Sequence, residues 1–162
     1  MPSFKMLPTK GIYTLIMFLS KETRLNVGKL GFCKFPRGYY AYTGSALGMG
    51  ASGLRGRVSR HYRRDKKNFW HIDFLLANEN TTLTSVVAAQ TSKKLECEIN
   101  HFIKEIGGAE IPVPGFGASD CRKNCGSHLL YFKENIESKI AELYGKKLGF
   151  YTVMINFKLE KG

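Results

Sequence analysis

Residues 11–19 form an apolar run rich in aromatic and β-branched side chains, a composition that predicts a β strand. The run is too short to span a bilayer, and no other stretch of the sequence is long and apolar enough to do so. With 43% hydrophobic and 23% charged residues, the chain has the composition of an ordinary globular domain. Residues 1–8 lack the apolar centre of a signal peptide, so we expect a cytoplasmic protein that has no membrane partner.

Strand-like and helix-like segments follow one another along the chain and predict an α+β fold in one compact domain. Val, Thr, Tyr and Phe content predicts strands at residues 39–43, 82–89, 128–132 and 150–159, and a short hairpin within 26–35. Apolar residues at helical spacing predict helices at residues 54–64, 95–106 and 134–144, whereas residues 70–76 suit either a helix or a strand. We expect residues 1–132 to form the main domain and residues 133–162 to add a helix and a strand that pack on it.

The charge of the chain predicts a polyanionic partner. Twenty-five Lys and Arg residues against 13 Asp and Glu residues give a net charge of +12. A generally Lys-rich surface would also give this value, but seven of the basic residues lie between positions 55 and 67 and only one acidic residue, Asp65, lies among them. Such a cluster favours nucleic acid as the partner, because each neutralised phosphate releases counterions. We expect DNA as the partner more than RNA, although the sequence itself does not distinguish them. The predicted nucleic-acid-binding residues are Arg55, Arg60, Arg63, Arg64, Lys66 and Lys67.

A glycine-rich stretch at residues 44–56 could instead indicate a nucleotide site. Its pattern from Gly48 to Gly53 matches G-x-G-x-x-G, and Asp73 lies 20 residues beyond Gly53. However, Gly48 lies six residues past Tyr42 and not at a tight turn between strand and helix, and the following helix is rich in arginine. No Gly-Lys-Ser or Gly-Lys-Thr sequence supports a P-loop. We therefore favour a loop whose backbone approaches a phosphate chain.

Two tripeptides lie on separate predicted strands: Gly-Ile-Tyr at residues 11–13 and Tyr-Thr-Gly at residues 42–44. They resemble the two signature tripeptides of the GIY-YIG superfamily of endonucleases, with Thr43 in place of the usual Ile or Val. The spacing between them is long, and the predicted hairpin at residues 26–35 accounts for it as an insertion. The resemblance implies a small central antiparallel β-sheet flanked by helices.

Two later features extend the resemblance over about residues 10–106. Arg57 is followed four residues later by His61, as on the first helix of the family. Glu96 lies where the second helix of the family carries its metal-binding glutamate, and Glu98 is the alternative. All four features in this order indicate a GIY-YIG-type endonuclease, and the insertion suggests the Uri-type branch of the superfamily.

The resemblance implies a divalent-metal-dependent hydrolysis of phosphodiester bonds. Glu96 would hold one Mg²⁺ or Mn²⁺ ion, since a hard cation prefers carboxylate and water oxygens. Arg57 would bind the scissile phosphate through its planar guanidinium. Tyr13 would act as the general base, which requires a lowered pKa or a concerted proton transfer. Tyr42 would hydrogen-bond the phosphate or orient the water, and His61 would orient Tyr13 or contact the nucleic-acid backbone.

The cysteines suggest a second site. Four cysteines in a cytoplasmic protein do not indicate a disulfide framework. Cys97, Cys121, Cys125 and His128 form a set of soft ligands that suits tetrahedral zinc, although the spacing is not that of a common zinc knuckle. The alternative is that these thiols are simply buried. Structural Zn²⁺ is therefore a second possible cofactor.

Two alternative functions remain open at this stage. The chain could be a nucleic-acid-binding module that keeps the fold and no longer cleaves, or an interaction domain stabilised by zinc. Asp73 and Asp120 could support active-site residues, whereas His71, beside Trp70, is expected to be a core histidine with no functional role.

Overall fold

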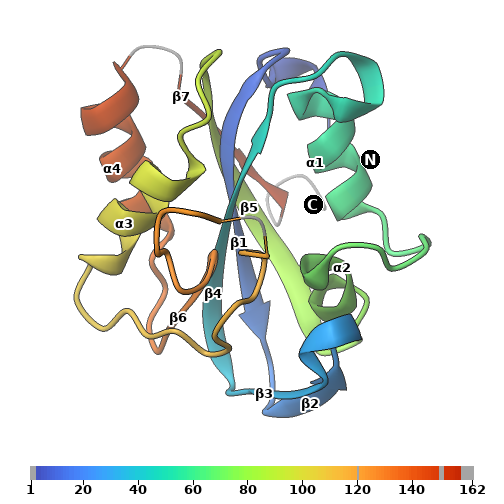
Figure 1. Cartoon of the computed structure of the whole chain (residues 1–162). Helices are drawn as coiled ribbons and strands as arrows, with labels where there is room; N and C mark the ends of the chain where they lie inside the picture. Colours follow the sequence, from blue (N-terminus) through green and yellow to red (C-terminus); the bar gives the residue numbers. More distant parts are fainter. Residues whose placement is uncertain (1–2, 120, 150–151, 158–162) are drawn as a thin grey trace.

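The structure is a computed structural model that describes residues 3–119, 121–149 and 152–157. Five strands form one antiparallel sheet in the order β6-β4-β1-β5-β7 (Figure 1). The strands are β1 (Gly11–Leu19), β4 (Gly38–Ala46), β5 (Thr81–Gln90), β6 (Leu129–Phe132) and β7 (Thr152–Asn156). Helices flank the sheet, so the predicted α+β class with a central antiparallel sheet is confirmed.

Helices cover both faces of the sheet, which explains why the first strand is apolar along its whole length. Helices α1 (Leu54–Tyr62) and α2 (His71–Leu76) lie on one side, and α3 (Glu96–Lys104) and α4 (Glu137–Leu148) lie on the other (Figure 1). Side chains on a strand alternate between faces. Leu15 and Met17 therefore belong to the core under α1 and α2, whereas Ile12 and Ile16 belong to the core under α3 and α4.

The predicted hairpin is also present, but it begins at residue 23 and not at residue 26, and residues 28–30 form a short 3-10 helix between its strands. Strands β2 (Thr23–Asn26) and β3 (Phe32–Phe35) pair with each other in a separate antiparallel sheet. In the sequence, this hairpin lies between β1 and β4. Three short 3-10 helices accompany the main elements: η1 (Phe4–Met6), η2 (Gly28–Leu30) and η3 (Gly50–Ser52). None of the helices in the described part of the chain is long and apolar enough to cross a membrane.

Element boundaries differ from the predictions in ways that the local structure explains. Residues 70–76, which the sequence left undecided, form the helix α2, because the carboxylate of Asp73 accepts the backbone N–H groups of Phe69 and Trp70 at its start, at 2.8 Å each. Helix α1 ends at Tyr62 and not at residue 64, because Arg63 adopts an extended conformation. Parts of the predicted strand at 150–159 lie outside the described residues.

The C-terminal segment is part of the central architecture. Strand β7 pairs with β5 at the edge of the sheet, and α4 packs against the core that includes Ile99 and Leu130. The hydroxyl group of Tyr144, on α4, lies 2.7 Å from the hydroxyl group of Thr14 on β1, inside this core.

Strand β4 is paired on both sides for only part of its length. On its outer side, β6 pairs with residues 39–42 of β4, and the Thr43 backbone N–H then donates to the carbonyl group of His128, at 3.2 Å. The next residues, 44–46, pair with β1 but have no strand partner on the outer side among the described residues. The two faces of the sheet therefore meet at an open edge beside these residues.

Asp73 provides a test of the fold. It is fully buried, forms a two-pronged ion pair with Arg60 at 2.8 and 2.9 Å, and its pKa is lowered because these hydrogen bonds and the charge of Arg60 outweigh burial, which alone would raise it. We expect Asp73→Asn to lower the free energy of unfolding by about 3 kcal/mol at neutral pH, because Arg60 and the two amides lose an anionic partner. The exposed substitution Asp65→Asn is the matched control and should change it little.

The pH dependence of the same pair has a defined sign. Because the pKa of Asp73 is lower in the folded state, its contribution is fully present above the unfolded-state pKa of about 3.9 and disappears as the pH falls through the lower folded pKa. Chemical denaturation of wild type and Asp73→Asn should give free energies that converge below about pH 4. A constant difference down to strongly acid pH would show that the ion pair is not the cause.

Candidate active site and metal cluster

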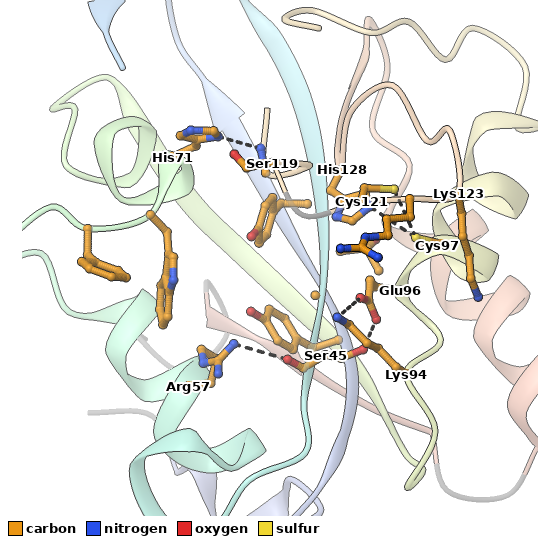
Figure 2. Close-up of a pocket in the computed structure, with 18 residues that line it drawn as sticks. Ser45, Arg57, His71, Lys94, Glu96, Cys97, Ser119, Cys121, Lys123 and His128 are labelled. Atoms are coloured by element: carbon orange, nitrogen blue, oxygen red, sulfur yellow. Dashed lines mark hydrogen bonds and ion pairs between the residues drawn. The ribbon is translucent and has the colours of Figure 1, made fainter. Parts of the chain in front are cut away.

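A cavity of about 610 Å³ lies beside the open end of β4. Its lining comes from β1, β4 and α1, from the start of α3, and from the loop that carries residues 117–128 (Figure 2). Four of the predicted catalytic residues line it: Tyr13, Tyr42, Arg57 and Glu96. The fifth, His61, lies in the core behind Tyr13. Residues that are distant in the sequence are therefore brought to one place.

Tyr13 and His61 form a buried pair. The hydroxyl group of Tyr13 lies 2.8 Å from Nε2 of His61, and Nδ1 of His61 has no partner among the described residues. His61 lies on the inner face of α1 with Leu54 and Val58, which places a polar ring at a core position. Burial lowers the pKa of His61 to about 3, so the imidazole is neutral at physiological pH. Burial also raises the pKa of Tyr13 to about 12, although the nearby charge of Arg57 acts in the opposite direction.

Gly44 allows Tyr13 to occupy this place. The two residues are cross-strand partners, and the ring of Tyr13 lies across the backbone of Gly44. A Cβ atom on Gly44 would lie 2.7 Å from the hydroxyl oxygen of Tyr13 and 2.9 Å from Cζ, which is too close for non-bonded atoms. The glycine of the second tripeptide is thus required by the tyrosine of the first.

Tyr42 lies on the same face of β4 as Gly44, next to the loop that closes the cavity. Its ring lies 6.3 Å from that of His61, measured between centroids, and burial raises its pKa. Gly117 packs against this ring in a left-handed conformation (φ 67°), and a Cβ atom there would lie 2.8 Å from Cε1 of Tyr42. The backbone N–H of Gly117 donates to Nδ1 of His71, at 2.9 Å. His71, to which the sequence gave no role, therefore anchors the loop over Tyr42.

Arg57 is held in the cavity by two contacts. Its guanidinium donates to the carbonyl group of Ser45, at 3.3 Å, and lies over the ring of Trp70, at 4.7 Å from the centroid. Arg60 lies over the same ring, at 4.4 Å, and is fixed by its ion pair with Asp73. A guanidinium has five N–H donors, so Arg57 keeps several for an oxyanion in the cavity. Asp73 therefore supports the site through Arg60 and Trp70, whereas Asp120 lies outside the described residues.

Glu96 reaches the same cavity from the other face of the sheet. It is 8% exposed, its carboxylate accepts a hydrogen bond from the Ser45 hydroxyl group at 2.5 Å, and Nζ of Lys94 lies 3.6 Å away. Ser45 belongs to the open end of β4, so the uncovered edge is what lets α3 contribute to a site built on the α1 side. The alternative glutamate, Glu98, is exposed and does not line the cavity.

Directly beside Glu96, four side chains form a cluster that could hold a metal ion. The ligand atoms of Cys97, Cys121, Cys125 and His128 all lie within 4.8 Å of one another. Sγ of Cys97 lies 3.6 Å from Sγ of Cys121 and 3.6 Å from Nε2 of His128. Tetrahedral zinc with sulfur ligands at 2.3 Å requires sulfur atoms about 3.8 Å apart, close to this spacing. Cys33, the remaining cysteine, lies elsewhere in the core, on strand β3 of the hairpin.

The environment of Cys121 suits an anionic sulfur. Burial raises the pKa of its thiol, but the backbone N–H groups of Cys125 and Lys123 are directed at the sulfur and, with the side chains of Cys125 and Cys97, lower the pKa to about 6. Amide donors of this kind stabilise a thiolate, which is the form of cysteine that binds metals. Burial raises the pKa of the other two thiols, Cys97 and Cys125, so it is the geometry of the four ligand atoms that suits the cluster to a cation.

Several of the predicted nucleic-acid-binding residues make contacts within the protein. Arg55 donates to the carbonyl group of Leu7, at 2.8 Å, and Arg60 pairs with Asp73. Arg64 donates to backbone carbonyl groups between the end of α2 and the start of β5. These arginines tie α1 to its neighbours, a role that sequence spacing alone does not indicate.

The other three predicted nucleic-acid-binding residues lie near the end of α1. Lys66 donates to the carbonyl groups of His61 and Arg63. Arg63 and Lys67 are exposed, and their side chains have no partner among the described residues. None of the six lines the cavity, so their part in binding nucleic acid stays a prediction.

The basic residues that do line the cavity were missed in the sequence, apart from Arg57. They are Lys94, next to α3, and Arg122 and Lys123, between two cysteines of the cluster. Their separation in the sequence hides them, because no local run of charge marks them. Phe69, which also lines the cavity and is 78% exposed, was missed as well.

Comparison with models of protein families gives a match over residues 12–148 to a family described as a domain of unknown function, DUF123. The chain belongs to the DUF123 family. No curated protein and no solved structure matches it. The DUF123 match includes every residue that lines the cavity and all four residues of the metal cluster. It also includes α4, so the DUF123 domain extends beyond the part of the chain that resembles the GIY-YIG enzymes.

The contact between Gly44 and Tyr13 can be tested in this DUF123 protein. Gly44→Ala should lower the free energy of unfolding by about 1–3 kcal/mol, because the new methyl group overlaps the tyrosine hydroxyl group and must displace the ring. Gly145→Ala, on α4 with open space around its Cβ position, is the control and should raise it by about 0.5–1 kcal/mol. Equal effects of the two substitutions in urea denaturation would contradict this account.

Proposed function

We propose that this DUF123 protein is a divalent-metal-dependent endonuclease of the GIY-YIG type, which hydrolyses phosphodiester bonds in nucleic acid. The observation that carries the proposal is that four of the motif residues line one cavity and the fifth, His61, contacts Tyr13 behind it, although they come from β1, β4, α1 and α3. An accidental match of short patterns gives no reason for such a convergence. Those residues are Tyr13, Tyr42, Arg57, His61 and Glu96.

The charges around the cavity support a phosphate-containing substrate. Four cationic side chains line it, from Arg57, Lys94, Arg122 and Lys123, and one carboxylate, that of Glu96, which leaves a formal charge of +3. A concave site with this excess attracts a polyanion and raises its local concentration. A neutral ligand would leave these charges without counterions.

The residues around Glu96 suit a hard cation. A carboxylate with a neighbouring hydroxyl group supplies oxygen ligands, and Mg²⁺ commonly uses one or two carboxylates and keeps several waters. Once bound, Mg²⁺ or Mn²⁺ would lower the pKa of a coordinated water and polarise a phosphate oxygen. Lys94, 3.6 Å from Glu96, offsets the carboxylate charge in the absence of a cation.

The remaining residues position the substrate and move protons. Arg57 binds the scissile phosphate through the guanidinium donors that face the cavity, and its stacking on Trp70 fixes the direction of these donors. Tyr13 keeps its proton at neutral pH, with a pKa of about 12, so accepting a proton from the attacking water requires the tyrosine proton to move. Nε2 of His61, 2.8 Å away on a neutral ring, is the group that can accept it. Tyr42 donates from the other side, to the phosphate or the water.

We further assign Zn²⁺ to the cluster of Cys97, Cys121, Cys125 and His128. Three sulfur ligands and one imidazole nitrogen prefer zinc over magnesium or manganese, and a closed set of four protein ligands is typical of structural and not catalytic zinc. In this assignment the protein has two different metal sites, one for a hard cation at Glu96 and one for a soft cation at the adjoining cluster.

A second candidate function, binding of nucleic acid without cleavage, is favoured by the same cationic lining and does not need Glu96 or Tyr13. A zinc-stabilised domain that binds another protein is the third, favoured by the cluster alone. The three differ in what each requires from Glu96 and from nucleic acid.

Cleavage assays with the Glu96→Gln variant test the nuclease proposal. Wild type should cut at least one member of a panel of labelled DNA and RNA substrates, including branched duplexes, with Mg²⁺ or Mn²⁺ and not with EDTA. Glu96→Gln and Tyr13→Phe should each lower the rate by about 10²-fold or more while substrate binding is retained, since each removes a group needed only for the chemical step. Glu98→Gln, on the exposed side of the same helix, should cleave like wild type.

The alternatives predict other results in the same experiment. Salt-sensitive binding with no metal-dependent cutting of any substrate would support the binding module. Cutting that survives in Glu96→Gln would show that the activity belongs to a contaminant or to another site.

Metal analysis tests the zinc assignment. Purified wild type should contain one zinc ion per chain, and removal of the ion by a chelator should lower the melting temperature, because an ion that binds only the folded state stabilises it. Cys97→Ser should lose the zinc. Cys33→Ser, at a cysteine outside the cluster, is the control and should retain it. Full zinc content in Cys97→Ser would refute the assignment.

A further inference from the structure

The segment between Cys121 and Cys125 forms an arch over the metal cluster. Its two ends are cluster ligands, and the three residues between them are exposed: Arg122, Lys123 and Asn124. Asn124 has a φ of 56°, which makes it the one non-glycine residue in a left-handed conformation among those described. Asparagine tolerates this conformation better than most residues, and here it turns the chain back toward Cys125.

The backbone of this arch is fixed at both ends: Lys104, on α3, donates to the carbonyl group of Cys125. The Cys121 backbone N–H donates to the carbonyl group of Ala118, at 3.0 Å, and the backbone N–H groups of Lys123 and Cys125 are directed at the Cys121 sulfur. In the described part of the chain, the side chains of Arg122 and Lys123 have no hydrogen-bond or ion-pair partner. The conformation of the arch is thus set around a sulfur atom that a cation would hold.

The arch also forms one side of the cavity. Arg122 and Lys123 both line it, and Figure 2 shows Lys123 and Arg57 on opposite sides of Glu96. Arg57 comes from α1, whereas the arch is joined to the start of α3 through the cluster, because Cys97 follows Glu96 directly. A nucleic-acid backbone with its scissile phosphate near Arg57 and Glu96 would therefore pass between two cationic walls.

We propose that the ion held by Cys97, Cys121, Cys125 and His128 builds a second phosphate-binding wall of the cleft, on which Arg122 and Lys123 bind the nucleic-acid backbone opposite Arg57. This inference rests on the proposed function, since it takes nucleic acid as the ligand. It assigns the cluster a role in substrate binding besides fold stability. The two cations contact phosphates that flank the scissile one, and they are positioned only when the ion is present.

The salt dependence of binding tests the wall. The probe is a labelled oligonucleotide duplex, with every protein in a Glu96→Gln background and no Mg²⁺ present, so that binding is measured without cleavage. Replacing both Arg122 and Lys123 by glutamine should make the slope of log K against log salt concentration less steep by about two, since each phosphate contact contributes about 0.9. The matched control replaces Lys133 and Lys139, which are exposed and do not line the cavity, by glutamine and should leave the slope unchanged.

A second comparison tests the dependence on the ion. Removal of the cluster ion from the otherwise intact protein should reduce the slope by the same amount as the double substitution. The double variant should lose nothing further when its own ion is removed, because its wall has no cations to position. Since loss of the ion also lowers stability, circular dichroism should first confirm that the stripped protein is folded under the assay conditions.

The outcomes separate this inference from the function on which it rests. The parent protein could bind with salt sensitivity while the double variant shows an unchanged slope. This result overturns phosphate binding by Arg122 and Lys123 and leaves the nuclease proposal intact. Additive losses from the double substitution and from ion removal overturn the coupling to the ion. No binding by the parent protein to duplex or single-stranded DNA or RNA refutes the nucleic-acid function itself.

Discussion

The incomplete pairing of β4 determines where a site can form in this protein. Because β6 ends its pairing opposite Tyr42, the next residues of β4 have β1 on one side and, within the described part of the chain, no strand on the other. An uncovered strand edge presents backbone groups and removes the barrier between the two faces of a sheet. Here the edge lets Glu96, from the α3 side, bind Ser45 while Arg57, from the α1 side, binds the carbonyl group of the same residue.

The chain segment that stops the pairing also supplies ligands. On the outer side of β4, the carbonyl group of His128 accepts a backbone hydrogen bond from Thr43, where the pairing with β6 ends. The imidazole of His128 belongs to the metal cluster. The position of His128 therefore determines both where the open edge of β4 begins and where the metal cluster forms. The hydrogen bond from Gly117 to His71 holds the same loop at its other end, so the loop is tied to both β4 and α2.

Much of this architecture could be predicted from the sequence, because its signals are local. Apolar periodicity and β-branched content indicated the strands of the central sheet and every main helix except α2, and the composition of residues 26–35 indicated the inserted hairpin. The motif tripeptides pointed to Tyr13 and Tyr42, and the spacing of Arg57 and His61 pointed to Arg57. Tyr13, Tyr42 and Arg57 all line the cavity. The choice of Glu96 over Glu98 agrees with their different exposures. Residues 70–76 were undecided because the helix depends on Asp73, whose partners lie partly outside the segment.

The parts that could not be predicted depend on contacts between distant segments. Arg60 and Arg64 lie in a basic run that suggests a binding surface, yet their partners are a buried carboxylate and backbone carbonyl groups of another element. Conversely, Arg122 and Lys123 follow no pattern, and only the folding of their loop over the start of α3 brings them to the cavity. The spacing of charges in a sequence does not say which of them are already neutralised inside the fold.

Adjacent positions on the first turn of α3 face two sites of different chemistry, an oxygen site at Glu96 and a sulfur site at Cys97. Under the proposed function, a displacement of this turn would change both sites and would link them thermodynamically. Linkage is reciprocal: if occupancy of the cluster strengthens the binding of a ligand in the cavity by some factor, that ligand must strengthen retention of the ion by the same factor. The protein would then hold its ion least firmly when its cavity is empty.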